Sequence, residues 1–492
     1  MTNRLGTLVL LAIALGCSGC TPPPALRPPP AGPLALVGAR VVDLDGGAAL
    51  PATVVIVAGH IAAVGPADAV PIPPGTRVID AAGAFVIPGL WDMHAHTTYA
   101  TPAEVERAFF PALVAHGVLG MRDLGSRFPA EQTRFWRGAI AEGRLVGPRL
   151  AALGQVVDAR PTTVGTLLVR NEAEAVGALA SARRDGYDFV KPYNDLSRAA
   201  YGALAREAAH RGLALAGHLP HGVAAREASE LGQRSVEHLS NLWFEVASAD
   251  ERIRERILRG LDAGEPPIAL FQAKIDTLFP LAFETYDAAR ERELFARFVR
   301  NGTWQVPTLV VDRYYARPAL QPGRARPDAA SARLLPGWVR QSGQLLDRFL
   351  AGLTPAQRAT LAELYRREAA MVGRMQRAGV GILAGSDAPG AYLAPGAALH
   401  DELEALVRDA GLSPREALRA ATLNPAVYFG AADSLGTVAP GRAADLVLLQ
   451  ADPTIDIRHV RRIRAVVTQG RYFDRSALDS LLTQVERAVA RR

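Results

Sequence analysis

The sequence is poor in two residue types, lysine and cysteine. Lysine and arginine together number 55, yet only Lys191 and Lys274 are lysine. Either residue supplies positive charge at a surface, so each remaining lysine points to a property that a guanidinium group lacks. Both cysteines, Cys17 and Cys20, lie at the N-terminus. A disulfide therefore cannot cross-link the rest of the chain.

The sequence also lacks any dense block of basic residues with interleaved aromatics. Its formal charge of +6 is therefore not arranged to follow phosphates, and nucleic acid is excluded as a partner. With 49% hydrophobic and 21% charged residues, the composition is that of a folded protein and excludes disorder as the main state. The 492 residues suffice for two domains or for one large barrel with additions.

Residues 1–20 are typical of an export signal. Their apolar run, residues 5–15, is too short for a comfortable transmembrane helix. The segments ending at Cys17 and Cys20 both resemble a bacterial lipobox, whose cysteine becomes lipidated, and a plain cleaved signal is the alternative. We expect an exported, periplasmic protein whose only membrane contact is a lipid anchor on one of these cysteines. Residues 21–34 are rich in proline and predict an extended tether.

In the rest of the chain, the pattern of apolar and polar residues changes twice. Residues 35–85 and 431–475 contain short Val/Ile runs punctuated by Gly and Pro, which predict strands. Two small half-sheets are most stable when joined, so we expect a composite β-sandwich from these segments. Residues 86–430 alternate apolar strands with Ala/Arg/Glu-rich helices at the spacing of a βαβ unit. This α/β pattern predicts a (β/α)8 TIM barrel, followed by a helix over residues 476–492.

Six of the eight expected barrel strands end in polar residues. They end at His96, Asp123, Val157, Lys191, His218, His238, Leu309 and Asp387. The separation from His238 to Leu309 exceeds one unit. We expect residues 250–305 and 317–336 to form extra helices over the barrel mouth or, alternatively, a crystal-packing surface or subunit interface. Because the C-terminal ends of barrel strands converge on one face, we expect the chemistry there.

The motif His94-Ala95-His96 closes the apolar run that starts at Val86. In a strand, side chains at positions i and i+2 point to the same face, so both imidazoles would meet at one spot. This arrangement suits a metal ion, although a solvated strand can show the same alternation.

Lys191, His218, His238 and Asp387 have less specific meanings when taken singly. The histidines can be structural, Asp387 can cap a helix, and Lys191 can extend to solvent along its aliphatic stem. Yet a lysine that closes an apolar strand is unusual here. A desolvated amine has a lowered pKa, and its neutral form can add carbon dioxide to give a carbamate. A carbamate is an anionic, bidentate ligand that can bridge two metal ions.

Taken together in this order, the six side chains resemble those of the amidohydrolase superfamily with a binuclear metal centre and a carboxylated lysine. The flanking segments that carry the resemblance are residues 86–94, 235–239, 384–387, 421–426 and 435–447. The resemblance extends from Ala35 to Phe473, and the branch it suggests is imidazolonepropionase-like and prolidase-like. Imidazolonepropionases typically lack the bridging lysine, so Lys191 argues against that activity.

The resemblance implies roles for these residues. His94, His96 and Asp387 would hold one divalent metal, His218 and His238 a second, and carboxylated Lys191 would bridge them. Zinc suits such ligands, as do manganese, cobalt and iron. A water shared by the two metals would lose its proton near neutral pH and attack the substrate. Asp387 would accept that proton and deliver it to the leaving group.

We therefore expect a hydrolase that cleaves an amide-type C–N bond in a small molecule, such as a dipeptide or N-acyl amino acid. A lactonase or phosphotriesterase is the alternative within catalysis, and a non-catalytic binding lipoprotein is the alternative outside it. Tyr193, His221 and His400 are the candidate substrate contacts, although each can equally be a packing residue. Arg122 and Asp123 can pair with each other or bind a substrate carboxylate. The resemblance favours a homo-oligomer.

Overall fold

A computed structural model of the chain describes residues 27–66, 68–97, 100–126, 128–161, 165–239, 241–320 and 329–490. The expected export signal, with Cys17 and Cys20, lies outside the described residues, as does the start of the proline-rich tether. Within the described segments, none of the helices has the length and apolar character that a membrane crossing requires.

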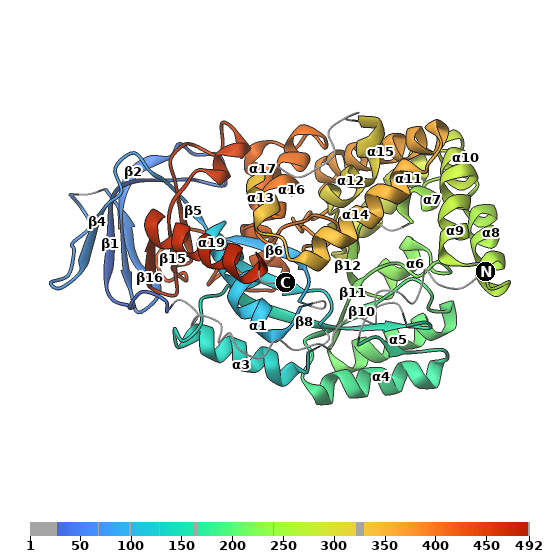
Figure 1. Cartoon of the computed structure of the whole chain (residues 1–492), viewed down its shortest axis with the longest axis horizontal. Helices are drawn as coiled ribbons and strands as arrows, with labels where there is room; N and C mark the ends of the chain where they lie inside the picture. Colours follow the sequence, from blue (N-terminus) through green and yellow to red (C-terminus); the bar gives the residue numbers. More distant parts are fainter. Residues whose placement is uncertain are drawn as a thin grey trace.

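The centre of the molecule is a parallel sheet curved into a barrel (Figure 1). Its strands, in spatial order, are β6 (Leu90–Ala95), β7 (Val118–Asp123), β8 (Arg149–Asp158), β10 (Phe189–Pro192), β11 (Ala214–Gly217), β12 (Gln233–Glu237) and β13 (Trp304–Val306), and the short β9 (Leu167–Leu168) pairs with β8. The strands are almost entirely buried, as expected for a parallel sheet that is covered by helices.

The eighth expected strand, the one ending at Asp387, is irregular. Residues 381–388 lie between β13 and β6, where Ile382 pairs with Gln305 and Ala388 with Ala95 as isolated bridges. Gly385 lets this segment approach β6, because a Cβ atom there would lie 2.6 Å from the Cβ of His94. The predicted TIM-type barrel is thus confirmed, with its last position filled by an extended segment rather than by a regular strand.

Helices surround the barrel and connect its strands. The connecting elements are α1 (Pro102–Glu104), the π-helix η1 (Val105–Phe109), α2 (Phe110–Ala115), α3 (Ala130–Ala141), α4 (Glu172–Asp185), α5 (Arg198–Arg211), α6 (Ala225–Glu230), α11 (Ala288–Asn301), α15 (Pro355–Arg377), α16 (Ala397–Arg408), α17 (Pro414–Ala420) and α18 (Leu423–Tyr428). Their ends follow local sequence signals. In α5, for example, the Ser197 side chain accepts from the Ala200 N–H and Gly212 ends the helix in the left-handed region.

Additional helices lie between β12 and β13 and after β13. They are α7 (Leu242–Glu245), α8 (Asp250–Asp262), α9 (Pro267–Ala273), the π-helix η2 (Lys274–Leu278), α10 (Phe279–Glu284), α12 (Leu309–Leu320), α13 (Ala329–Arg333) and α14 (Gly337–Ala351). Figure 1 shows α7 to α10 at the end of the molecule farthest from the β1–β5 strands. Several of these helices line the larger of two cavities at the barrel mouth, described below.

The predicted terminal half-sheets join in one sheet. Its strands are β1 (Leu34–Val41), β2 (Leu50–Val57), β3 (His60–Gly65), β4 (Arg77–Asp80), β5 (Phe85–Pro88), β14 (Leu446–Leu449), β15 (Ile463–Thr468) and β16 (Arg471–Asp474). The two halves meet where β5 pairs antiparallel with β14, with Pro88 opposite Leu446. The sheet has its own apolar core, separate from that of the barrel, which includes Leu36, Ile56 and Val467.

Two connections tie this sheet to the barrel. Only Gly89 separates β5 from the first barrel strand, β6, and its N–H donates to the Asp445 carbonyl just before β14. After the 3-10 helix η3 (Ile457–Arg461), β15 and β16, the chain ends in α19 (Arg475–Ala490), which packs on η1 and α2.

Candidate metal centre

Three predicted ligands converge at the barrel mouth. The Nε2 atoms of His94 and His96 lie 3.2 Å apart, and the Asp387 Oδ1 atom lies 3.3 Å and 3.0 Å from them. Ligand atoms about 2.1 Å from a tetrahedral zinc ion are roughly 3.4 Å apart, so these three atoms have the spacing of one coordination sphere. The His-x-His alternation along β6 therefore directs both imidazoles to one spot, as expected.

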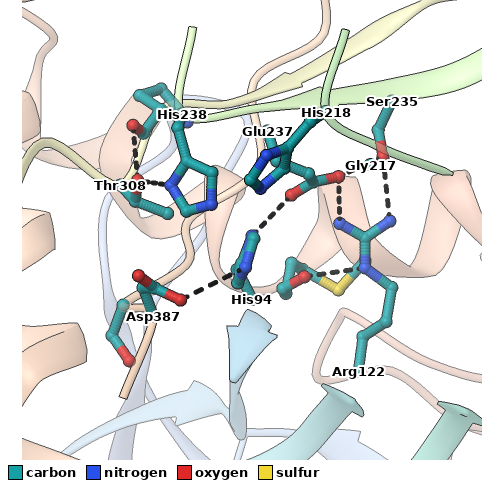
Figure 2. A network of polar contacts seen from close by, with 12 residues as sticks. His94, Arg122, Gly217, His218, Ser235, Glu237, His238, Thr308 and Asp387 are labelled. Atoms are coloured by element: carbon teal, nitrogen blue, oxygen red, sulfur yellow. Dashed lines mark hydrogen bonds and ion pairs between the residues drawn. The ribbon is translucent and has the colours of Figure 1, made fainter. Parts of the chain in front are cut away.

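The buried ion pair of Arg122 and Glu237 fixes His94 through Nδ1, the ring nitrogen that does not contact Asp387 (Figure 2). Its Nδ1–H donates to Glu237 Oε2 at 2.8 Å, which leaves the Nε2 lone pair directed at the cluster. Arg122 donates to the Glu237 Oε1 atom at 2.9 Å and to the Met93 carbonyl at 2.7 Å, and Ser235 donates to the same Oε1 atom at 2.5 Å. The tautomer and orientation of His94 are thereby set by the protein.

His218 and His238 complete a set of adjacent imidazoles. Their ring centroids lie 4.9 Å apart, and His238 lies 4.4 Å from His94. The His238 Nδ1–H donates to Thr308 Oγ1 at 2.7 Å, and the His218 Nδ1–H donates to Asn194 Oδ1 at 2.9 Å. Among the described residues, the buried His218 Nε2 atom has no hydrogen-bond partner. A buried nitrogen held in this orientation without a partner fits a metal ligand.

Lys191 lies at the end of β10 and is 2% exposed. With His96, His218, His238 and Asp387 it lines a cavity of about 160 Å³. Burial lowers the pKa of the Lys191 amine to about 8. The structure thus places five of the six predicted ligand residues around one cavity, and the sixth, His94, lies behind them in contact with His96, His238 and Asp387.

The electrostatic environment keeps the imidazoles of His94, His218 and His238 neutral. Burial, with the neighbouring cations, holds the pKa of His94 and His218 well below the ordinary value and lowers the pKa of His238 to about 4. Burial opposes ionisation of Asp387, but the hydrogen bond from His96 and the nearby Lys191 ammonium still lower its pKa. Neutral imidazoles and an ionised carboxylate are the protonation states that bind divalent metals.

Two of these residues adopt backbone conformations that L-residues rarely use. His238 has a φ of 60° and Asp387 a φ of 58°. Such non-glycine residues in the left-handed region cost free energy and persist where the surrounding structure holds them. Both side chains are directed at the metal-ligand cluster (Figure 2).

The candidate substrate contacts separate into two groups. The Tyr193 ring stacks on His218, with 4.1 Å between centroids, and lines the same cavity as the ligands. His221 lines the larger cavity beyond it. The structure places His400 elsewhere: it is 2% exposed on α16, and its Nε2–H donates to the His116 carbonyl at 2.9 Å. Its position at the start of a helix directs it into the packing against α2 rather than toward the mouth.

The suggested pairing of Arg122 with Asp123 does not occur. Arg122 points into the barrel and pairs with Glu237, so it does not meet substrate. Asp123 instead accepts from the Thr97 hydroxyl and from the Gly125 N–H. Adjacent residues in a strand point to opposite faces, which separates the two charges.

Sequence reasoning missed two buried acids that orient the cluster, Glu237 and Asp92. Asp92 accepts from the Ser386 N–H at 3.0 Å, from the Ser386 hydroxyl at 2.5 Å and from the His94 N–H at 3.2 Å. It thereby ties β6 to the segment that carries Asp387, and burial raises its pKa to about 6. The available signal was an acidic residue inside an otherwise apolar strand, next to or two residues before a ligand histidine.

A larger cavity of about 410 Å³ opens from this centre and is shared with His238. Its walls come mainly from the additional helices and from α15. They include Trp243, Lys274, Asp312 and Glu368. It offers a small molecule a mostly apolar space with a few charged groups beside the metal-ligand cluster.

Comparison with known proteins gives a family match and partial relatives. Residues 350–473 match the amidohydrolase family. Adenine deaminase 3 of Rhizobium meliloti is 27% identical over 256 residues, 44% of this chain and 41% of that protein. An adenine deaminase of Rubrobacter xylanophilus is 30% identical over 209 residues, 35% of this chain and 34% of that protein. The chain thus spans less than half the length of these curated relatives.

Solved structures match over nearly the whole chain. Bottromycin amidohydrolase has a TM-score of 0.71 at 24% identity, covering 93% of this chain and 90% of that one. A putative prolidase from Bifidobacterium longum has a TM-score of 0.63 at 23% identity, covering 93% and 100%. Ochratoxinase from A. niger has a TM-score of 0.63 at 20% identity, covering 90% and 96%. These likenesses establish the fold, in agreement with the barrel predicted from sequence.

Proposed function

On the premise that this chain belongs to the amidohydrolase superfamily, we propose that it is a metal-dependent hydrolase that cleaves an amide-type C–N bond of a small molecule. Dipeptides and N-acyl amino acids are the proposed substrate classes. The observation that carries the proposal is the convergence of His94, His96 and Asp387 beside two further imidazoles and a buried lysine.

The donor set fits two divalent metal ions, which we propose to be zinc. His94, His96 and Asp387 would hold one, and His218 and His238 the other. Lys191, as a carbamate, would supply the anionic ligand between them. When bound, such ions lower the pKa of water and polarise a carbonyl group.

The chain itself supplies the proton transfer. Asp387 is ionised, its side chain is 27% exposed, and it lines the cavity together with His96, Lys191, His218 and His238. It would accept the proton of the attacking water and return it to the leaving nitrogen. Glu237 and Arg122 hold His94 in place during this exchange, and Tyr193 and His221 would contact the substrate.

A second candidate reaction is deamination of a purine, since the curated relatives include adenine deaminases. This reaction also breaks a C–N bond. The 410 Å³ cavity has room for either substrate class.

The test is hydrolysis by the metal-loaded protein on a panel of dipeptides, N-acyl amino acids, adenine, a lactone and a phosphotriester. We expect about two metals per chain, turnover of an amide, and a ~100-fold or greater loss of kcat in Asp387→Asn. Asp479→Asn, at an exposed aspartate on α19, is the matched control and should behave like wild type. Binding without turnover of any amide would contradict the proposal, as would turnover of the lactone or phosphotriester alone.

We also propose that the protein is exported and held at a bacterial membrane by a lipid on Cys17 or Cys20, and that it forms a homo-oligomer. The N-terminal sequence supports the first point and the family resemblance the second. Mass spectrometry of the mature N-terminus in Cys17→Ser and Cys20→Ser would identify the modified residue. Light scattering of the metal-loaded protein would give its oligomeric state.

A further inference from the structure

Two acidic side chains in the larger cavity have no role in the metal centre. Asp312 lies on α12 and Glu368 on α15, two helices that pack against each other. Both residues line the 410 Å³ cavity, which they share with His238. Glu368 is only 6% exposed, and Asp312 is partly buried. The pair is therefore placed where a substrate held at the metal centre would extend.

These carboxylates lack partners within the described part of the chain. The Asp312 Oδ2 and Glu368 Oε2 atoms are buried with no hydrogen bond, and neither residue forms an ion pair there. Several other buried acids are paired with arginine. Glu237 pairs with Arg122, Glu245 with Arg226 and Arg254, and Glu291 with Arg374. Asp312 and Glu368 thus differ from these arginine-paired acids, and they line a cavity in which a ligand could supply the missing partner.

Leaving them unpaired has an electrostatic cost. Burial, with the nearby Asp387, raises the pKa of Asp312 to about 7, and burial, with Asp312, raises the pKa of Glu368 well above its ordinary value. The cavity lysine does not offset this, because Lys274 acts on the pKa of Asp195 and His221 and not on that of Asp312 or Glu368. A cation placed between the two carboxylates would remove their mutual repulsion and supply the missing hydrogen-bond donors.

We infer that Asp312 and Glu368 form a binding site for a cationic group, an amine or a guanidinium, carried by the substrate. The inference rests on the proposed function, since it concerns the substrate of the same site. It selects among the proposed amides those with a free ammonium or a basic side chain, and it disfavours neutral N-acyl compounds.

The test uses amide substrates that differ only in charge. Each basic dipeptide is paired with its neutral isostere, lysine with norleucine and arginine with citrulline, and each free amine with its N-acetylated form. The first comparison reports a side-chain cation and the second an α-ammonium. The variants are Asp312→Asn and Glu368→Gln, which conserve shape. Glu363→Gln, on the outer face of α15 where Glu363 pairs with Arg366 and Arg367, is the control.

We expect wild type to prefer the cationic member of at least one pair by ~100-fold in kcat/KM. Each variant should lose ~10-fold or more for that substrate, mainly through KM, and stay within about threefold of wild type for the neutral one. Glu363→Gln should change neither value. Equal rates of wild type on charged and neutral members would overturn the inference while leaving the proposed function intact. Equal losses on both members in the variants would overturn it as well.

A binding measurement covers the case in which no amide is hydrolysed, which would count against the proposed function. Calorimetry of metal-loaded protein with L-lysinamide and L-norleucinamide then tests the site directly. Tighter binding of lysinamide that disappears in Asp312→Asn and Glu368→Gln supports the cation site, and equal binding overturns it. A third divalent metal bound by wild type and lost in these variants would also overturn it, because the pair would then be a metal site.

Discussion

The candidate metal centre and the larger cavity beside it both contain buried polar groups, yet these groups find hydrogen-bond partners to different extents. In the metal centre, His94 donates to Glu237, His238 to Thr308, and His218 to Asn194, so each imidazole has a fixed orientation. In the cavity, Asp312 and Glu368 have no such partners among the described residues. The ligand imidazoles are held in one orientation by hydrogen bonds to other protein groups. The two cavity carboxylates, which we infer bind a charged ligand, have no such bonds within the described segments.

The largest effect on either region is expected from replacing Lys191, the lysine of the candidate metal centre. We expect both Lys191→Ala and Lys191→Arg to lose the second metal and ~1000-fold or more in kcat, because neither side chain can form a carbamate. Short carboxylic acids should partly restore Lys191→Ala by supplying an anionic ligand. Metal analysis and turnover provide the measurement, and Lys274→Arg, at the only other lysine, should keep its metals. Wild-type metal content in Lys191→Arg would refute the carbamate.

A second prediction concerns Glu402, a buried acid of the core that, unlike Asp312 and Glu368, does not line the cavity. Glu402 is fully buried, accepts from the Val310 N–H, and leaves its Oε1 atom unbonded. Burial raises its pKa to about 8, above the usual value of an unfolded glutamate, so the folded state holds the proton more tightly. Its contribution to stability is therefore complete below about pH 4.5 and declines as the pH rises toward 8.

We expect this decline to be absent in Glu402→Gln. The free energy of unfolding of the variant relative to wild type should therefore rise by on the order of 4 kcal/mol from pH 5 to pH 9. Denaturant unfolding at several pH values measures the effect. Glu404→Gln is the control, since Glu404 lies on the same helix and pairs with Arg408. Parallel stability curves for wild type and Glu402→Gln would show that Glu402 titrates normally.

A third prediction weakens the support behind one ligand. Glu237→Gln removes the charge that orients His94 and leaves Arg122 buried without its counterion. We expect metal affinity to fall by ~10 to 100-fold, with little change in KM for the metal-loaded protein. Competition with a chelator measures the affinity, and Glu207→Gln, in the helix-surface pair with Arg211, is the matched control. A change in KM alone would place Glu237 with the cavity instead.

The smallest effect is expected at His400, which belongs to neither region. His400→Gln should leave kcat/KM within about threefold of wild type and cost about 1 kcal/mol of stability, through the bond to the His116 carbonyl. Kinetics and thermal unfolding of the same preparation distinguish the two effects. A large rise in KM with unchanged stability would return His400 to the substrate site.

Local pattern predicted the position of five candidate ligands, because each lies within one residue of the end of a barrel strand: His94, His96, Lys191, His218 and His238. The alternation of His94 and His96 and the apolar runs before Lys191 and His218 suffice, since parallel strands of a barrel end on one face. Asp312 and Glu368 gave no such signal. The two residues are 56 positions apart in the sequence and lie on different helices, so only the packing of α12 on α15 brings them together. Contacts between helices that are far apart in the sequence leave no periodic pattern in the local sequence.

The irregular eighth strand was missed for a related reason. The apolar residues around Ile382 predict a strand, but Gly385 and the hydrogen bonds to Asp92 hold the segment in a different shape. The joining of the terminal strands was easier to predict, because β5 and β14 both need a partner.

The single residue between β5 and β6 has a practical consequence. Gly89 links the outer sheet to β6, the strand that carries His94, so the N-terminal strands cannot be removed without disturbing the barrel. Deleting β1 would strip β5 of one neighbour and expose the apolar layer behind it, and the displacement would reach the ligands within a few residues. Fusion partners, affinity handles and surface attachment therefore belong upstream of Leu34, where shortening or replacing the chain leaves this junction untouched.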